Sequence, residues 1–160
     1  MGIKDKLLAV LVVMIWGFNF VVIRWGIETV HPMVMTMLRF ILTAFPMILF
    51  VKKPDVPMKF VVLYGTLLGA AVWGLVNFAV FYGMPAGMAS LLLQLSPFLS
   101  VIAATVFFNE RVTRVKFLGI VIALTGFILV CRNKADHLIL LNIGLMLVAA
   151  LFWTVCNMII

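Results

Sequence analysis

Six long apolar runs, separated by short links with charged or turn-forming residues, dominate the sequence. The runs are 7–27, 32–51, 60–82, 85–108, 117–131 and 138–160. A helix needs about 20 mostly apolar residues to cross the hydrocarbon core of a bilayer. The run 117–131 is shorter, and we expect its neighbours Lys116 and Arg132 to complete the span by reaching to the interface. The pattern predicts an all-α membrane protein, a polytopic bundle of about six transmembrane helices.

The overall composition excludes a soluble domain. Hydrophobic residues make up 66% of the chain and charged residues 11%, whereas soluble domains are about half apolar and a quarter charged. A soluble chain of this length has too little interior to bury so much apolar surface. The same figures exclude a disordered chain and a nucleic-acid-binding domain.

Basic residues collect on one side of the predicted bundle. Because the links are short, successive helices run antiparallel, and alternate links lie on the same side of the membrane. One side carries Lys4, Lys6, Lys52, Lys53, Lys59, Arg111, Arg114 and Lys116. The other carries Arg132 and Lys134, with Arg24 near its boundary. Cytoplasmic links are rich in Lys and Arg, so we expect a cytoplasmic N-terminus, and the net charge of +7 requires no nucleic-acid partner.

Four of the predicted helices carry a polar side chain at a similar depth. Counted from the outer ends, these side chains lie roughly 8–14 Å below the membrane surface. They are Arg39, Asn19, Asn77 and Gln94, and we predict that they bind the substrate. No Asp or Glu lies within a predicted helix to pair with Arg39, whereas a substrate carboxylate would provide a bidentate partner. The alternative is that the amide side chains only form hydrogen bonds between helices.

Two prolines lie inside predicted helices. Pro46 and Pro97 have no N–H group, so each frees a backbone carbonyl four residues earlier. Gln94 and Ser96 flank the second of these sites. Freed carbonyls are tolerated in a membrane where a helix lines a cavity, so we expect a kinked helix beside the substrate. The alternative is a kink whose carbonyl is satisfied by neighbouring helices.

The remaining aromatic and charged residues have simpler explanations. Trp16, Trp73 and Trp153 are able to stack on a ligand, but packing on helix faces is the commoner role of such bulky side chains. Arg24 and Glu28 lie one turn apart near the predicted membrane interface, where an i,i+4 ion pair explains both residues.

No catalytic or metal-binding motif occurs in the sequence. Paired carboxylates, HExxH, GxSxG, a phosphate-binding loop and a His/Cys cluster are all absent. We therefore expect no enzymatic activity, no cofactor and no metal site. The lack of a carboxylate inside the membrane also argues against a pump for organic cations.

The sixth apolar run resembles the first. When the two are aligned, Trp16 and Trp153 fall in register, and Asn19 corresponds to Asn157 within one position. Five helices precede the sixth run, so a second copy would insert with the opposite orientation, as in inverted-repeat transporters. The predicted domains are a first five-helix repeat at 1–135 and the start of a second, truncated repeat at 136–160.

Several short motifs resemble those of the EamA family of drug/metabolite transporters. They are Trp16-Gly17-Phe18-Asn19-Phe20, Leu38-Arg39-Phe40, Ser96-Pro97-Phe98, Asn109-Glu110-Arg111 and the spaced glycines Gly119 and Gly126. Two further strings, Ala44-Phe45-Pro46 and Gly83-Met84-Pro85-Ala86-Gly87-Met88-Ala89-Ser90-Leu91, are similar to bacterial members that export O-acetylserine and cysteine. The resemblance implies two five-helix repeats and a secondary transporter that exports small amino-acid metabolites across the bacterial inner membrane.

The implied partners are a small-molecule metabolite and the lipid bilayer. The sequence departs from the family in length, because it offers one repeat and one further helix. The alternative is therefore a truncated, non-transporting fragment that needs the missing second half, or a homo-oligomer. We expect no transport by this chain alone, since a site at a repeat interface needs both repeats.

Overall fold

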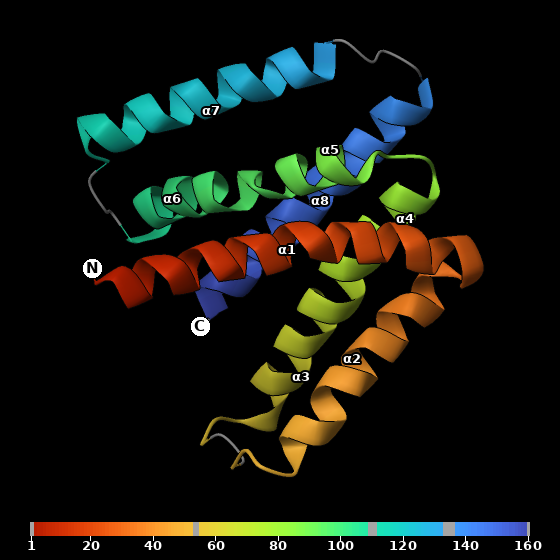
Figure 1. Cartoon of the computed structure of the whole chain (residues 1–160). Coiled ribbons are helices and arrows are strands. Elements are labelled where there is room, and N and C mark those ends of the chain that lie inside the picture. The colour runs from red at the N-terminus through yellow and green to blue at the C-terminus, as the bar shows by residue number, and fades with distance from the viewer. Residues whose placement is uncertain (1, 53–54, 109–111, 133–136, 160) are drawn as a thin grey trace.

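The computed structural model describes residues 2–52, 55–108, 112–132 and 137–159. All regular secondary structure within these ranges is helical (Figure 1). The elements are α1 (Ile3–Thr29), α2 (Pro32–Ile48), α3 (Met58–Thr66), the π-helix η1 (Leu67–Trp73), α4 (Gly74–Phe81), α5 (Ala86–Leu93), α6 (Leu95–Phe108), α7 (Arg114–Arg132) and α8 (His137–Ile159). The motif at 109–111 and the predicted domain boundary at 135–136 lie outside the described residues.

Four stretches of helix are long and apolar enough to cross a bilayer. They are α1, the helix Met58–Phe81 formed by α3, η1 and α4, the pair α5 and α6 over Ala86–Phe108, and Leu140–Ile159 within α8. The helix α2 is apolar but shorter, and α7 occupies the fifth predicted run. The protein is an all-α membrane bundle, as predicted, while the number of about six spans stays a prediction.

The ends of α2 follow from its sequence. His31 precedes the helix, and its Nδ1 accepts a hydrogen bond of 3.3 Å from the backbone N–H of Met33. Pro32 takes the first helical position, where a backbone N–H would have no helical partner. The helix continues through Pro46, which removes the hydrogen bond to the Leu42 carbonyl, and ends at Ile48, shortly before the predicted end.

Two irregular segments lie inside the long helices. The π-helix η1 connects α3 to α4, and the sequence analysis does not predict it. The helix that starts at Ala86 breaks at Gln94, whose N–H bonds to the Leu91 carbonyl at 3.2 Å in a tight turn before α6. Pro97 lies in the first turn of α6 and has no N–H to continue the helix, which confirms the kink predicted there.

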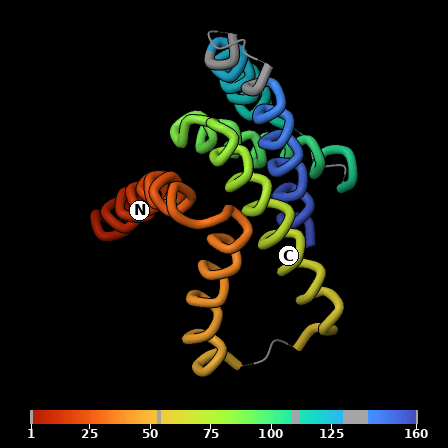
Figure 2. The backbone as a smooth tube through the Cα atoms, turned by 90° about the vertical axis from the view of Figure 1, so that its right-hand side faces the viewer, coloured from red at the N-terminus to blue at the C-terminus, as the bar shows by residue number. Residues whose placement is uncertain are grey.

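The helix α8 lies at the centre of the arrangement. It packs against α4, η1, α5 and α6, and Figure 2 shows α7 at the edge of the molecule. Its contacts with α6 are partly polar: the Thr154 hydroxyl lies 3.5 Å from that of Ser96, and Asn157 Nδ2 donates to Ser100 Oγ at 3.2 Å. Hydrogen bonds of this kind join helices where no water competes.

The apolar core forms where α1, η1, α4, α5 and α8 meet. Its most buried members include Phe20, Ile23, Val72, Trp73, Val76, Ala79, Val80, Met84, Leu92 and Met146. Most apolar side chains outside this core are exposed, which suits helices whose outer faces contact lipid. Because Trp73 is part of the core, the π-helix that carries it is held against α1 and α8.

Candidate substrate-binding site

A small cavity brings two of the predicted site residues together. It has a volume of about 210 Å³ and is lined by Ile15, Trp16, Asn19, Arg39 and Trp73. These side chains come from α1, α2 and η1, so three helices build one wall each. Asn19 and Arg39 are therefore neighbours in space, while their depth in the membrane stays a prediction.

The guanidinium of Arg39 stacks on an aromatic ring. Its Cζ lies 3.9 Å from the centroid of the Trp73 ring, which is a close cation–π contact. Stacking occupies the face of the guanidinium and leaves the N–H groups at its edge free to donate. Arg39 Nη1 and Asn19 Nδ2 are both buried without a hydrogen-bond partner among the described residues. Because buried donors are usually paired, this pair of donors fits a polar or anionic ligand.

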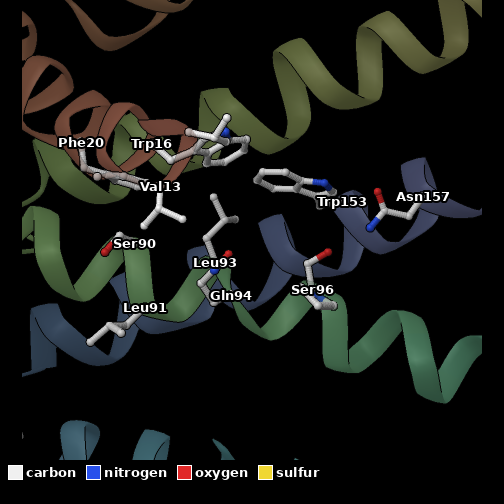
Figure 3. Close-up of a pocket in the computed structure, with 13 residues that line it drawn as sticks. Val13, Trp16, Phe20, Ser90, Leu91, Leu93, Gln94, Ser96, Trp153 and Asn157 are labelled. Atoms are coloured by element: carbon white, nitrogen blue, oxygen red, sulfur yellow. The ribbon is translucent and has the colours of Figure 1, made fainter. Parts of the chain in front are cut away.

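A larger cavity of about 480 Å³ also has Trp16 in its lining (Figure 3). Its lining residues are Val12, Val13, Trp16, Gly17, Phe20, Ser90, Leu91, Leu93, Gln94, Ser96, Pro97, Trp153 and Asn157. Gln94 reaches this cavity because the helix breaks at that residue, between α5 and α6. The structure therefore places Gln94 in a different cavity from Arg39 and Asn19, and Trp16 lines both cavities.

Asn77, the fourth predicted site residue, lies elsewhere. It is fully buried on α4, and its Nδ2 donates a hydrogen bond of 2.7 Å to Thr36 Oγ1 on α2. It lines neither cavity. This is the contact between helices that the sequence analysis considers as the alternative role of an amide in the membrane. Thr36 lies one helical turn before Arg39, so the hydrogen bond fixes the part of α2 that carries the guanidinium.

Three tryptophans from different helices meet between the cavities. The ring centroids of Trp16 and Trp153 are 5.5 Å apart, those of Trp73 and Trp153 are 5.8 Å apart, and those of Trp16 and Trp73 are 6.2 Å apart. Packing is the role expected for these residues, and they do pack, but they also line the cavities: Trp16 lines both, Trp73 the smaller one and Trp153 the larger one. The alignment of Trp16 with Trp153 in the two similar runs is the sequence signal that could have identified these two residues as cavity-lining.

The ion pair expected near the membrane interface is present. Arg24 Nε lies 3.2 Å from Glu28 Oε1, and both side chains are largely exposed. This confirms the i,i+4 pair and keeps Arg24 apart from both cavities.

Comparison with known proteins decides the family. A model of the EamA-like transporter family matches residues 5–132, which is most of the chain. The chain belongs to the EamA-like transporter family. The family predicted from the short motifs is thus confirmed, and the four long apolar helices agree with the predicted multi-pass membrane protein.

Individual EamA-like relatives extend this finding. The chain is 38% identical to a probable amino-acid metabolite efflux pump of Escherichia coli K12 and 37% identical to one of Salmonella typhimurium LT2, each over 98% of the chain and 53% of the relative. It is 28% identical to an uncharacterized transporter of Archaeoglobus fulgidus over 79% of the chain and 47% of the relative. The chain spans about half the length of these relatives. No solved structure gives a significant match.

Proposed function

We propose that the protein is a secondary transporter that exports small amino-acid metabolites, similar to cysteine or O-acetylserine, across a bacterial inner membrane. The observation that carries the proposal is the pair of buried, unpaired donors, Arg39 Nη1 and Asn19 Nδ2, in the small cavity; no acceptor for them lies among the residues that the structure describes. The printed names of the Escherichia coli and Salmonella relatives support the substrate class and the direction of transport.

In this proposal Arg39 holds the substrate carboxylate. Its guanidinium rests on Trp73, so the ring fixes the plane in which the N–H groups point. A carboxylate in that plane accepts two parallel hydrogen bonds, and Asn19 lies in the same cavity to donate another. The arrangement favours an anionic group over an organic cation, because the guanidinium itself is positive.

Gln94 and Asn77 have different roles in this proposal. Gln94 lines the larger cavity, where its amide is available to the rest of the substrate. Asn77 does not contact the substrate but positions α2 through its hydrogen bond to Thr36. It is a positioning residue for Arg39.

Alternating access would come from the rocking of one repeat against another, with the cavities opening to each side of the membrane in turn. We propose that a second set of helices, from a second repeat or a second copy of the chain, closes the site. The relatives are long enough to hold such a second repeat. The comparisons do not favour the alternative of a truncated fragment without transport activity.

Substitution of Arg39 tests the proposal. Arg39→Ala removes the guanidinium, and Arg39→Lys keeps the charge but loses the planar pair of N–H groups. Loss of one partner from a buried charged pair costs about 2–5 kcal/mol, which lowers affinity roughly 30-fold or more. We expect Arg39→Ala to abolish export of O-acetylserine and Arg39→Lys to retain little, measured as amino acid released into the medium by cells that produce the chain together with the second half of the Escherichia coli relative.

Arg24→Ala is the matched control. It removes an arginine from an exposed ion pair that lies outside both cavities, so export should stay at the wild-type level. Immunoblots of membrane fractions must show equal amounts of all variants, because loss of insertion would imitate loss of binding. Wild-type export by a normally inserted Arg39→Ala variant would contradict the proposal.

A further inference from the structure

A single residue is common to the two cavities. Trp16 is the one residue that lines both of them among the described residues, and its indole packs against those of Trp73, which lines the smaller cavity, and Trp153, which lines the larger one. Figure 3 shows Trp16 and Trp153 adjacent at one wall of the larger cavity. The two cavities thus meet at Trp16.

The two cavities differ in chemistry. The smaller one contains a charged side chain, Arg39, beside the amide of Asn19. The larger one has no charged side chain among its lining residues, and its polar groups are the neutral side chains of Ser90, Gln94, Ser96 and Asn157. An amino acid shows the same contrast, because it has a charged carboxylate at one end and a side chain at the other.

We propose that Trp16 is a specificity-determining residue, which divides one substrate site into a compartment for the carboxylate and a compartment for an uncharged side chain. This inference rests on the proposed function, because it takes Arg39 as the carboxylate-binding group. It adds that the transported amino acids carry uncharged side chains. A charged side chain in the larger cavity would be desolvated without a counter-charge from any lining residue.

Trp16 is suited to this role by its exposure beside both cavities. Trp73 is 5% exposed and is held under the guanidinium of Arg39, whereas Trp16 is 42% exposed. Gly17, the next residue, also lines the larger cavity, and a β-carbon there would meet no other heavy atom within 4 Å. Trp16 is therefore available to contact the substrate side chain in the larger cavity, while Trp73 holds the guanidinium of Arg39.

Binding by the purified chain in lipid nanodiscs tests the inference. The probes are glycine, O-acetylserine and glutamate, which share the carboxylate and amino groups and differ in the side chain. Binding is followed by tryptophan emission, which Trp73 and Trp153 still report when Trp16 is replaced. We expect O-acetylserine to bind at least about tenfold more tightly than glycine, and glutamate at least about tenfold more weakly than O-acetylserine.

Trp16→Ala should remove most of this discrimination. The ratio of O-acetylserine to glycine affinity should fall toward one. The ratio is the readout because Trp16 also lines the smaller cavity, where its loss affects the shared carboxylate of all three probes alike. Trp25→Ala is the matched control, since Trp25 lies on the same helix, is 61% exposed and lines neither cavity. That variant should keep the wild-type ratios, and equal circular dichroism spectra confirm that both variants fold.

The outcomes separate this inference from the proposed function. Equal affinities for glycine and O-acetylserine, tight binding of glutamate, or an unchanged ratio in Trp16→Ala would overturn the role of Trp16 and leave the carboxylate site intact. If none of the three probes binds to the wild-type chain, the carboxylate site fails and the partition fails with it.

Discussion

Arg39 lies half-buried in a membrane helix beside an aromatic ring rather than an acid. A charged side chain at the centre of a membrane helix costs about 2.5–3.5 kcal/mol on insertion scales. A desolvated cation–π contact such as the one with Trp73 returns about 2 kcal/mol. The net cost of placing Arg39 in the membrane is then about 1 kcal/mol, and a bound carboxylate would lower this cost. The empty site thus has a small net free-energy cost, and binding of an anion stabilises it.

Asn77 allows the positioning role to be tested at the level of one hydrogen bond. Asn77→Ala and Thr36→Val each remove one partner of the contact between α4 and α2. Hydrogen bonds between membrane helices contribute about 0.6 kcal/mol on average and up to about 1.7 kcal/mol. We expect each variant to lose an amount in this range from the free energy of unfolding, measured by denaturation in mixed micelles.

The double variant distinguishes positioning from direct binding. If the two side chains act through each other, the losses in Asn77→Ala and Thr36→Val will not add, and O-acetylserine affinity will fall by the same few-fold in both. Loss of binding in Asn77→Ala together with normal binding in Thr36→Val would show instead that Asn77 contacts the substrate.

The sequence predicts depth in the membrane but not direction around a helix. Asn19 and Arg39 were expected near the same depth as Asn77 and Gln94, and the structure brings only the first two together. One residue turns an α-helix by about 100°, so side chains at one depth face different neighbours. Packing between helices determines which neighbour each side chain faces, and a single sequence does not reveal that packing.

At the scale of elements, the break at Gln94 is the feature that most shapes the larger cavity. Pro97 prevents the helix of α5 from continuing directly into α6. We expect Pro97→Ala to restore the missing N–H, to make residue 94 helical and to withdraw Gln94 from the cavity. Maleimide labelling of Gln94→Cys, in a background without native cysteines, should become several-fold slower, and O-acetylserine binding should weaken.

Pro46→Ala provides the comparison for Pro97→Ala. Pro46 lies inside α2, whose helix continues through it for two further residues, so its replacement should change neither the labelling of position 94 nor binding. Unchanged labelling in Pro97→Ala would mean that tertiary contacts, rather than the proline, maintain the break.

The π-helix η1 is an element that the sequence does not predict. The apolar runs predict the long helices closely, because hydropathy registers which residues face lipid. A π-helix changes only the hydrogen-bond spacing, to i→i+5, and the segment Leu67–Trp73 is apolar throughout. No contrast between polar and apolar faces marks the extra residue per turn, although it sets the direction of Trp73 toward Arg39.

For the molecule as a whole, the basic residues predict how the bundle lies in the membrane. We expect cysteines placed at Asp55 and Thr113 to be labelled from the cytoplasm, and cysteines at Val30 and Ala135 from outside, in a background without native cysteines. Membrane-impermeant maleimide applied to intact cells, and then to opened cells, measures the side of each position. Labelling of position 55 in intact cells would reverse the predicted topology.

The stacking of Arg39 on Trp73 also has a consequence for biosynthesis. The chain emerges from the ribosome N-terminus first, at about 5–20 residues per second, so Trp73 follows Arg39 by roughly 2–7 s. During that interval α2 carries a guanidinium whose aromatic partner has not yet been made, while Trp16 and Asn19 of α1 already exist. The insertion machinery must therefore keep α1 and α2 together near its lateral exit until η1 arrives, and the second helix of this protein should leave for the lipid later than its hydropathy alone suggests.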